Sequence, residues 1–443
     1  MQRTEPARGM RDFLPEDVRR REYVIGVIKR VYERYGFEPL ETPAVENLET
    51  LMGKYGEEGN QLIFKILKRG EHEASGQADL ALRYDLTVPL ARVIAHHQAK
   101  LPKLFKRYQI QPVWRADRPA RGRFREFYQC DVDALGSTSP VIEAEVCAAV
   151  SDALKELGFN DFVIRMNHRQ LLTSVLTRAG FSEEQQGPAL VILDKLDKIG
   201  EEGVVREWLA KGLGDEVVLG EAARILVSNL PSLDAVSDFV AGDEAGTAAV
   251  QNLRAVMSLA EGTSAAQKIT FDGTLARGLS YYTGAIMEIN VADLAGSLGG
   301  GGRYDNLVGM FLGQSVPACG FSLGLERILV VMGEKNMFPA GLATAPADVM
   351  VALFDAANMS HAIRVATRLR EAGLRVLVYP DADKIGRQIK YADSRGIPFV
   401  AILGGDEITA GTVTVKNLTA QTQQTCDQAA AGAAILEGLK QRG

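Results

Sequence analysis

Two long strand-like runs constrain the fold of this chain more than any other feature of its sequence. The run LFKRYQIQPVWR spans residues 104–115, the run FREFYQCDVDAL spans residues 124–135, and the short polar loop ADRPARGR joins them. Two such runs joined by a loop with turn residues predict an antiparallel hairpin.

Helical patterns lie on both sides of the hairpin. Apolar residues recur at helical spacing over residues 15–35 and again over residues 140–157, and each pattern stops at a glycine. Residues 172–265 carry several short helical patterns and no strand signals, whereas strand-like pieces resume at KITFDGT and SYYTGAIMEINV. The segment 172–265 is therefore predicted to be a helical insertion.

The composition changes after Pro339. The segment AGLATAPA has small residues and a proline, which is typical of a linker. Strand and helix patterns then alternate from VMVALF to PFVAIL with short loops, which predicts a small α/β domain with a partly parallel sheet. The expected boundaries are 1–171 with 266–335 for the first domain, 172–265 for the insertion, 336–346 for the linker and 347–443 for the last domain.

Composition excludes several classes of protein. Hydrophobic residues make up 46% of the chain and charged residues 24%, which is too apolar for a disordered chain. No apolar stretch approaches the roughly 18 residues of a membrane span, and the polar amino terminus has no signal-peptide core. The 4 cysteines are far apart, without a CxxC pair, so neither a zinc cluster nor a disulfide framework is indicated. We expect a cytoplasmic protein with no membrane association.

The charges are unevenly distributed. The net charge is −6, so the chain as a whole does not have the basic character of a nucleic-acid binder. Residues 100–125 nevertheless hold nine Lys or Arg and one acid, whereas residues 172–263 hold seven basic and fifteen acidic residues. A local anion site is therefore predicted near the hairpin, and the acidic insertion is a poor candidate for tight phosphate contact.

Alternation along the second run places a chemically mixed set of side chains on one strand face. The set is Arg125, Phe127, Gln129, Asp131 and Asp133. Arg115 on the partner run and Arg123 in the loop can approach this face. Guanidinium groups bind phosphate, a ring can stack on a base, and carboxylates with an amide can hold an ammonium, so the face suits a nucleotide and an amine. From alternation alone, a solvated face with charge pairs is the alternative.

Two pairs of residues are further candidates with structural alternatives. Asp85 and Thr87 precede a helical pattern, where an N-cap is the more frequent role for such residues. Tyr281 and Tyr282 lie in a strand-like piece. Adjacent residues of a strand point to opposite faces, so at least one of the two tyrosines is expected in the core.

A glycine run and an arginine complete the candidates. Gly299–Gly302 permits close backbone approach to a ligand, or a sharp turn, and fits neither a P-loop nor GxGxxG. Arg327 begins an apolar helix after a strand, where an anion or an ion pair would offset the cost of its burial. The sequence has no HExxH and no GxSxG motif, so neither a metalloprotease nor a serine hydrolase is indicated.

Taken in order along the chain, these segments resemble the class II aminoacyl-tRNA synthetases, and within them the histidyl-tRNA synthetase family. FKRYQIQPVWRADRPARGRFREFYQCDVDALG resembles the second motif of the class and GFSLGLERI the third, while the first helix and YGFEPLETPAVE resemble the first motif, which ends in a proline, here Pro43. LRYDLT, LARGLSYYTG and GGGRYDNLVG resemble the family's own signatures, with Ser280 where the family usually has Asp. The resemblance implies an α+β catalytic domain built on an antiparallel sheet, with a helical insertion, and a carboxy-terminal α/β anticodon-binding domain.

The resemblance also implies an activity. The chain would activate histidine with ATP to histidyl-adenylate and transfer the histidyl group to the 3′ end of tRNA(His), as a homodimer and with Mg²⁺ accompanying the pyrophosphate. The implied histidine-binding residues are Asp85, Thr87, Gln129, Asp133, Tyr281 and Tyr282. The implied ATP-binding residues are Arg115, Arg123, Phe127 and Arg327. Arg115 and Arg277 would be the catalytic arginines at the α-phosphate, and no protein metal ligand is implied.

A non-catalytic paralogue that regulates ATP phosphoribosyltransferase in histidine biosynthesis is the alternative. Such a protein resembles the catalytic domain alone. The carboxy-terminal unit from about residue 346 and the retained Arg277, Tyr281 and Tyr282 favour the ligase. Synthetases for proline, threonine or glycine share the terminal domain but not RGLSYYTG with GGGRYD.

Overall fold

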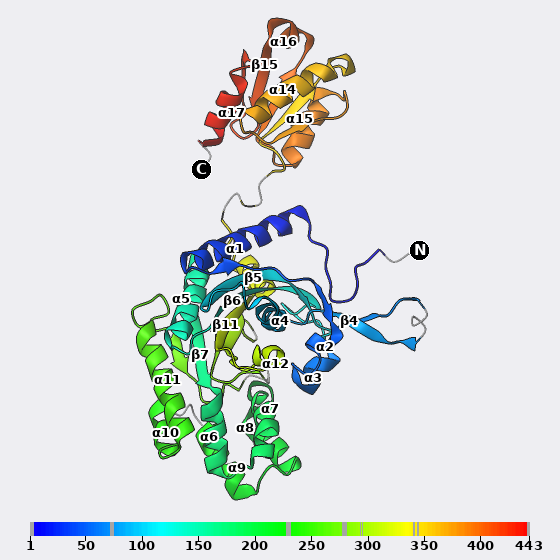
Figure 1. The fold of residues 1–443 in the computed structure, drawn as a ribbon. Helices are drawn as coiled ribbons and strands as arrows, with labels where there is room; N and C mark the ends of the chain where they lie inside the picture. Colours follow the sequence, from blue (N-terminus) through cyan, green and yellow to red (C-terminus); the bar gives the residue numbers. More distant parts are fainter. Residues whose placement is uncertain are drawn as a thin grey trace. The chain divides into compact units, whose positions relative to one another are not determined.

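The computed structural model describes most of the chain. The described residues are 4–70, 75–226, 232–276, 281–292, 294, 296–339, 342 and 345–440, without the side chains of Glu57, Glu58, Asp197, Lys198, Glu216, Glu221 and Arg224. The chain divides into two compact units, Met1–Phe338 and Pro339–Gly443 (Figure 1). The finer domain boundaries given above stay predictions.

An eight-stranded sheet forms the centre of the first unit. Its strands, in spatial order, are β1 (Glu38–Pro39), β5 (Phe105–Trp114), β6 (Glu126–Leu135), β11 (Ala318–Gly324), β10 (Gly299–Arg303), β9 (Ala285–Val291), β7 (Phe162–His168) and β8 (Ile269–Phe271). All neighbours pair antiparallel except β1 with β5 and β7 with β8, at the two edges. The predicted hairpin is therefore confirmed as β5 and β6, which are the second and third strands from the β1 edge of the sheet.

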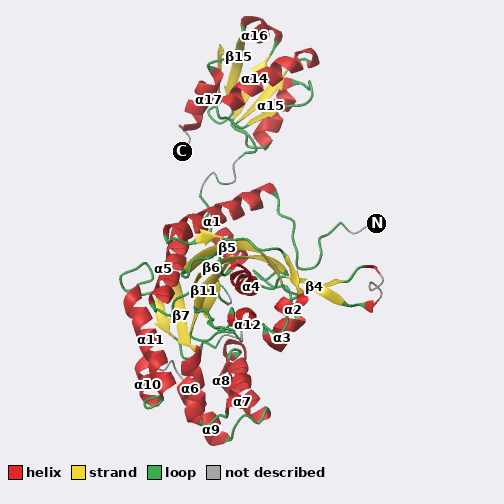
Figure 2. Ribbon diagram, in the orientation of Figure 1, coloured by secondary structure: helices red, strands yellow, loops and turns green. Residues whose placement is uncertain are grey.

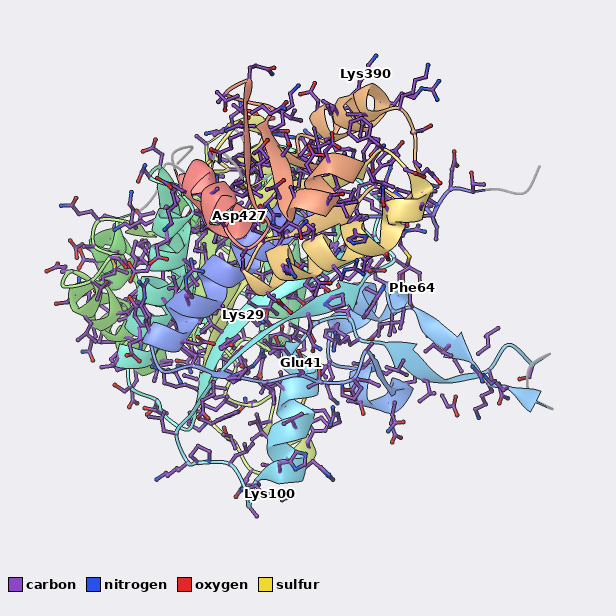
Figure 3. All side chains as sticks on the ribbon, turned by 90° about the horizontal axis from the view of Figure 1, so that it is seen from above. Lys29, Glu41, Phe64, Lys100, Lys390 and Asp427 are labelled. Carbon is purple, nitrogen blue, oxygen red and sulfur yellow. The ribbon has the colours of Figure 1, made fainter. Side chains whose placement is uncertain are left out.

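Three helices pack against one another and against this sheet. They are α1 (Pro15–Arg34), α5 (Val141–Glu156) and α13 (Leu325–Glu334). Helix α1 buries Val24, Ile28 and Val31 along one side, whereas Lys29 and Arg30 are exposed (Figure 3). The helical pattern of residues 15–35 is therefore confirmed, because its apolar stripe is the side that packs on the core.

Smaller elements lie beside the large sheet. A three-stranded antiparallel sheet has the order β2 (Val45–Asn47), β4 (Ala78–Leu82) and β3 (Lys65–Leu67). The accompanying helices are α2 (Leu48–Leu51), α3 (Gly56–Gln61), α4 (Thr87–His97) and α12 (Gly309–Leu312). The start of helix α4 contacts the large sheet, where Arg107 of β5 donates to the Leu86 carbonyl at 3.4 Å.

The segment predicted as an insertion is helical in its described residues. Its helices are α6 (Arg169–Ala179), α7 (Glu183–Leu193), α8 (Leu196–Ala210), α9 (Glu216–Leu226), α10 (Leu233–Phe239) and α11 (Glu244–Ala260). Fully buried Trp208 of α8 stacks edge to face on Phe181, with ring centroids 5.8 Å apart. Helix α11 contacts α5 and β7, which joins these helices to the sheet.

The second unit is an α/β sheet with the element order that its sequence predicts. The strands, in spatial order, are β13 (Val376–Val378), β12 (Val349–Leu353), β14 (Phe399–Leu403), β15 (Thr412–Asn417) and β16 (Thr422–Asp427). The first three are parallel to one another and the last two are antiparallel (Figure 2). Its helices are η2 (Ala356–Asn358), α14 (Met359–Glu371), α15 (Ile385–Ser394), α16 (Gly405–Ala410) and α17 (Ala431–Lys440).

The four consecutive glycines form a strand rather than a sharp turn. They begin β10, which is hydrogen-bonded to β11 on one side and to β9 on the other. Glycine is a poor strand former, so the reason for glycine at these positions lies in the packing of the neighbouring strands. A Cβ on Gly301 would come within 2.0 Å of the Gly320 carbonyl oxygen and 2.7 Å of the Phe321 Cα.

We expect Gly301→Ala to destabilise the first unit by about 1–3 kcal/mol, because the added carbon meets backbone atoms that cannot move aside. Thermal unfolding followed by circular dichroism measures the effect. The matched control is Gly333→Ala in α13, where an added Cβ meets nothing within 4 Å. Alanine is the better helix former, so the control is expected to be neutral or stabilising. Equal melting temperatures for the two variants would contradict this explanation of the glycine strand.

Among the described residues, no helix has both the length and the apolar character that a membrane span requires.

Candidate active site

A cavity of about 540 Å³ lies on the eight-stranded sheet and gathers the described site residues that the sequence predicts. They are Asp85, Thr87, Arg115, Arg123, Phe127, Gln129, Asp133, Tyr281, Tyr282 and Arg327. These residues come from segments spread over more than 240 positions of the chain. Arg277 and Ser280 lie outside the described residues.

The floor of the cavity is a row of directly paired residues that crosses the sheet. From β5 to β7 the row is Gln109, Asp131, Ser322, Gly300, Glu288 and Arg165. Directly paired residues lie on the same face of a sheet, so the five side chains of this row share one side. The glycine in the middle of the row has no side chain, which leaves space above the floor.

A second glycine shapes the neighbouring row. Gly320 of β11 pairs with Asp133 of β6, which pairs in turn with Arg107 of β5. A Cβ on Gly320 would lie 1.9 Å from Asp133 Oδ1. The absence of a side chain at residue 320 therefore lets the Asp133 carboxyl lie over β11, inside the cavity.

An acidic pair with one shared guanidinium occupies the floor. Fully buried Arg107 places Nη2 2.9 Å from Asp133 Oδ2 and 3.8 Å from Asp131 Oδ2. The Tyr304 hydroxyl donates to Asp133 Oδ1. Burial raises the pKa of both carboxyls, and Arg107 only partly offsets this effect. The pair therefore does not carry two full negative charges as readily as surface aspartates do.

Asp85 combines a capping role with a position in the cavity. Its Oδ1 accepts from the Val88 backbone N–H at 3.0 Å, at the start of α4, and from the Tyr55 hydroxyl at 3.0 Å. Its Oδ2 accepts from the Tyr281 hydroxyl at 3.4 Å. Burial raises the pKa of this carboxyl. The cap therefore fixes a carboxyl that lines the cavity, and the ligand role of this carboxyl stays a prediction.

The two adjacent tyrosines lie together, which corrects the expectation that they point to opposite faces. Tyr281 and Tyr282 precede β9, which begins at Ala285, so strand alternation does not apply to them. Their ring centroids are 5.1 Å apart in a T-shaped arrangement, and Tyr304 packs on Tyr281 with centroids 6.1 Å apart. All three rings line the cavity and form an aromatic wall beside the acidic floor.

Arg115 follows β5 and is held beside the aromatic residues of the cavity. Its Nε donates to the Tyr84 carbonyl at 3.0 Å, and its Cζ lies 4.3 Å from the Tyr84 ring centroid. The same Cζ lies 5.2 Å from the Phe127 ring centroid. The backbone contact orients the guanidinium toward the cavity, and the stacked rings limit its rotation.

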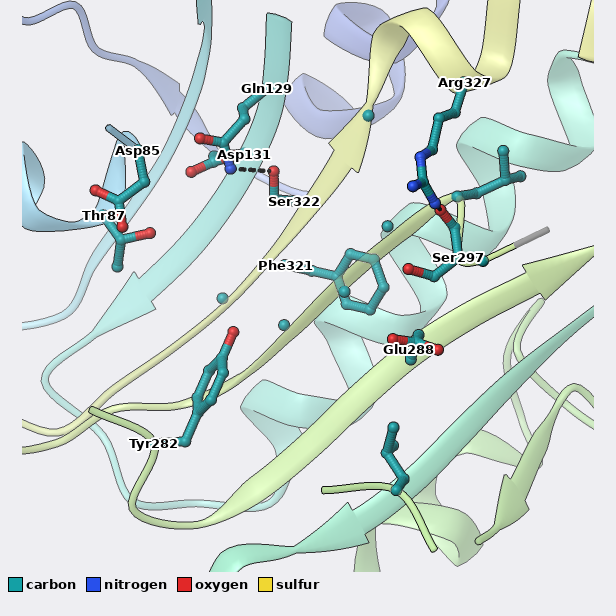
Figure 4. Close-up of a pocket in the computed structure, with 18 of the residues that line it drawn as sticks. Asp85, Thr87, Gln129, Asp131, Tyr282, Glu288, Ser297, Phe321, Ser322 and Arg327 are labelled. Carbon is teal, nitrogen blue, oxygen red and sulfur yellow. Dashed lines mark hydrogen bonds between the residues drawn. The ribbon is translucent and has the colours of Figure 1, made fainter. Parts of the chain in front are cut away.

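Two further arginines line other parts of the cavity. Arg327, in the first turn of α13, donates from Nη1 to the Ser297 carbonyl, and Figure 4 shows it reaching toward Ser297 from the helix. Arg123 pairs with Asp117 at 3.0 Å within the β5–β6 loop, and its side chain is half exposed. The cavity therefore carries cationic groups from the hairpin and from α13, around a floor that is acidic at one end.

Sequence reasoning missed several residues that hold this arrangement together. Arg107 and Tyr55 contact the carboxyls directly, and Ser322 accepts from Gln129 Nε2 at 2.9 Å (Figure 4). A signal existed for one of them, since Arg107, Gln109 and Gln111 occupy alternate positions of a strand-like run. These polar residues at alternate positions give the first run a polar face, and the second run has a polar face of the same kind.

The described residues contain no group of three or more His, Cys, Asp or Glu side chains arranged to hold a metal ion. Two glutamates line the cavity, but each has protein partners. Glu326 pairs with Arg21 at 2.8 Å and accepts from the Tyr128 N–H at 2.8 Å, and Glu288 lies 3.6 Å from Arg165. These carboxylates are therefore committed to structural pairs rather than arranged as a metal cage.

Comparison with known proteins agrees with this geometry. Residues 9–328 match the histidyl-tRNA synthetase family, and residues 348–437 match the anticodon binding domain family. The histidine–tRNA ligase of Cytophaga hutchinsonii is 40% identical over 96% of this chain and 97% of its own, and that of Gloeobacter violaceus is 41% identical over 98% of both. The crystal structure of histidyl-tRNA synthetase from Nostoc sp. PCC 7120 superposes with a TM-score of 0.80 at 33% identity and covers 99% of each chain. The chain therefore belongs to the histidyl-tRNA synthetase family.

Proposed function

We propose that this protein is a histidine–tRNA ligase that activates histidine with ATP and transfers the histidyl group to the 3′ end of tRNA(His). One observation carries the proposal: a single cavity joins an acidic and aromatic end, suited to a cationic amino acid with a ring, to arginines suited to phosphate. Relatives of about 40% identity over nearly the whole chain are named histidine–tRNA ligases, which supports the same conclusion.

In this proposal the acidic end binds the amino acid. Asp85, Thr87 and Gln129 receive the ammonium group, with Asp133 close by on the same strand face. Tyr281 and Tyr282 contact the imidazole. The buried carboxylates gain from a cationic ligand because burial leaves them few other counterions. An amino acid without a ring would leave the aromatic wall uncovered, and this difference would favour histidine over smaller substrates.

The arginines bind ATP. Phe127 stacks on the adenine, Arg327 and Arg123 hold the outer phosphates, and Arg115 holds the α-phosphate. Arg277 is assigned to the opposite side of the same phosphate on the strength of its signature LARGLSYYTG. This arrangement places the histidine carboxylate next to the α-phosphorus, between the two ends of the cavity.

The reaction then needs no protein nucleophile. The histidine carboxylate attacks the α-phosphorus, pyrophosphate leaves, and the tRNA 3′-terminal hydroxyl later displaces AMP from the histidyl-adenylate. Negative charge builds on the α-phosphate oxygens during the first step. A guanidinium that is fixed before the reaction, as Arg115 is by its carbonyl and ring contacts, stabilises that charge more in the transition state than in the ground state.

Mg²⁺ enters this scheme as part of the substrate, bound to the ATP phosphates. Mg²⁺ in such sites is usually bound by substrate phosphates and one or two carboxylates, which is why we assign the ion to the triphosphate. The proposal therefore assigns no step to a protein-held metal.

The remaining parts of the proposal concern tRNA, assembly and location. The second unit matches anticodon-binding domains, so we assign it to the anticodon of the tRNA.

We propose a cytoplasmic homodimer, as the first motif implies. Exposed apolar Val45, Leu67 and Leu80 on the small sheet support a partner surface. Light scattering of the purified protein is expected to give twice the mass of one chain.

The regulatory paralogue is less favoured than the ligase. The match to the anticodon binding domain family over residues 348–437, and relatives named as ligases over nearly their whole length, both favour the enzyme. No observation on this chain favours the regulator specifically.

Charging of tRNA tests the complete activity. The protein is incubated with labelled histidine, ATP, Mg²⁺ and a tRNA(His) transcript, and label in precipitated RNA is counted. We expect label in the tRNA, and none when the 3′-terminal diol has first been oxidised with periodate. Activity with the oxidised tRNA equal to that with the intact tRNA would contradict transfer to the 3′ end.

A further inference from the structure

Two buried acceptors in the cavity have no donor within the described residues. Gln129 Oε1 and Asp131 Oδ1 each lack a hydrogen-bond partner, although the residues are only 8% and 2% exposed. Both side chains line the cavity on the same face of β6, and Figure 4 shows them together on the side of Asp85 and Thr87. An unpaired buried acceptor costs free energy, so this pair is suited to a ligand that brings N–H donors.

The charges around Asp131 are unbalanced. The groups that face it are Arg107 of β5, Asp133 of β6, the Ser322 hydroxyl of β11 and Asp85 before α4. Arg107 contacts Asp131 and Asp133, and Asp85 adds a third carboxyl near Asp131. Asp133 and Asp85 already accept from tyrosine hydroxyls, whereas one oxygen of Asp131 has no donor. Of the three, Asp131 is thus the carboxyl with the most to gain from a cation.

We infer that Asp131 is a further substrate-binding residue, which accepts a hydrogen bond from the ammonium group of the amino acid and releases its own proton to solvent when that ammonium binds. This inference rests on the proposed function, because it takes histidine as the ligand. The exchange is balanced: a neutral carboxylic acid and an ammonium become a carboxylate–ammonium pair and one free proton. Asp131 acts here in binding and specificity, not in the chemical step.

The titration behaviour of the acidic cluster supports the exchange. Burial and, to a smaller extent, the neighbouring Asp133 together raise the pKa of Asp131 to about 7 against the opposing effect of Arg107. A bound ammonium favours the ionised carboxyl, so it lowers this pKa. Protons are therefore released on binding at pH values up to about 7, and affinity for histidine rises with pH over the same range.

Proton release is measurable on the unmodified protein. Histidine is titrated into the enzyme calorimetrically at pH 7 in buffers that differ in ionisation enthalpy, and the slope of the observed heat against that enthalpy counts the protons. With a pKa near the working pH, about half a proton per histidine is expected from this carboxyl. The imidazole of histidine also titrates in this range, so the comparison with a variant isolates the contribution of Asp131.

Asp131→Asn is the informative variant because it keeps the size of the side chain and resembles the neutral acid of the free site. We expect it to bind histidine about ten- to a hundred-fold more weakly at pH 8, with a smaller deficit at pH 6, where the wild-type protein must first lose a proton. It should also release fewer protons than the wild-type protein. Glu145→Gln is the matched control, since Glu145 pairs with Lys106 next to Arg107 but does not line the cavity.

Two analogues of histidine show whether Asp131 binds the ammonium group or the imidazole of the substrate. L-Histidinol keeps the ammonium and the imidazole, so the variant should bind it as poorly, relative to the wild-type protein, as it binds histidine. Imidazolepropionate lacks the ammonium, so the two proteins should bind it equally. An equal penalty with imidazolepropionate would show that Asp131 serves the imidazole and would overturn the assignment.

The outcomes separate this inference from the proposed function. If the wild-type protein does not bind histidine, the proposed function fails. If it binds histidine, and Asp131→Asn has the same affinity and the same proton count as the wild-type protein, the function stands and the inference about Asp131 is wrong. Imidazolepropionate carries the imidazole without the ammonium, so equal proton counts for histidine and this analogue on the wild-type protein would also overturn the inference, and this comparison needs no variant.

Discussion

Replacing Arg115 by alanine is expected to lower the rate of histidine-dependent pyrophosphate exchange by about a hundred- to a thousand-fold, the usual effect of removing one donor that is fixed toward developing charge. The guanidinium is held by the Tyr84 carbonyl at 3.0 Å and lies beside the Tyr84 and Phe127 rings. Its removal therefore deletes a preorganised charge from the proposed α-phosphate position without disturbing the acidic floor. Histidine binding should change little.

The measurement combines exchange kinetics with calorimetric titration of histidine. Arg118→Ala is the matched control, because this exposed arginine lies in the same hairpin loop and does not line the cavity. The control should keep the wild-type exchange rate, since the assay contains no tRNA. If Arg115→Ala exchanged at the wild-type rate, or lost histidine binding and exchange in equal measure, the role at the α-phosphate would be wrong.

Arg303→Ala is expected to destabilise the first unit by about 3–5 kcal/mol, because it leaves a buried carboxylate without its partner. Arg303 Nε and Nη2 contact Glu143 Oε1 and Oε2 at 2.7 and 2.8 Å, and the two side chains are 8% and 0% exposed. This bidentate pair joins the end of β10 to α5. Loss of this pair therefore weakens the attachment of β10, whose glycines line the cavity.

Urea unfolding of the first unit, followed by tryptophan fluorescence, measures this effect. Arg121→Ala is the control, since Arg121 also pairs with a glutamate, Glu334, but at a half-exposed surface position, where about 0–1 kcal/mol is expected. The double variant Arg303→Met with Glu143→Leu should recover much of the lost stability, because it removes both charges. A double variant less stable than Arg303→Ala would contradict the account of an uncompensated buried charge.

Much of the fold could be predicted because its signals are local. The apolar stripe of residues 15–35, the hairpin of residues 104–135 and the alternating elements after residue 346 all have periods that short windows reveal. The strand Gly299–Arg303 could not be predicted in this way. Its glycines are required by close backbone packing against β11, a contact between segments that lie together only in the folded chain.

The site residues, like the elements of the fold, divide into those with a local signal in the sequence and those that depend on tertiary contacts. Alternation on one strand was enough to group Phe127, Gln129 and Asp133, because one local period sets the direction of their side chains. Tyr55 and Arg107 were not found, since their roles depend on Asp85 and Asp133, which approach them only through tertiary packing. Tyr281 and Tyr282 are both buried, which confirms that at least one lies in the core, but the expectation of opposite faces was wrong because the strand begins later than the sequence suggests, at residue 285.

Exchange of labelled pyrophosphate into ATP, measured with each of the twenty amino acids and without tRNA, tests the central claim most directly. The account predicts exchange with histidine alone, because the chain belongs to the histidyl-tRNA synthetase family and its relatives are named histidine–tRNA ligases. Exchange with a different amino acid would contradict the assignment of the cavity. Folded protein with Mg²⁺ that supports no exchange with any amino acid would contradict the proposed activity itself.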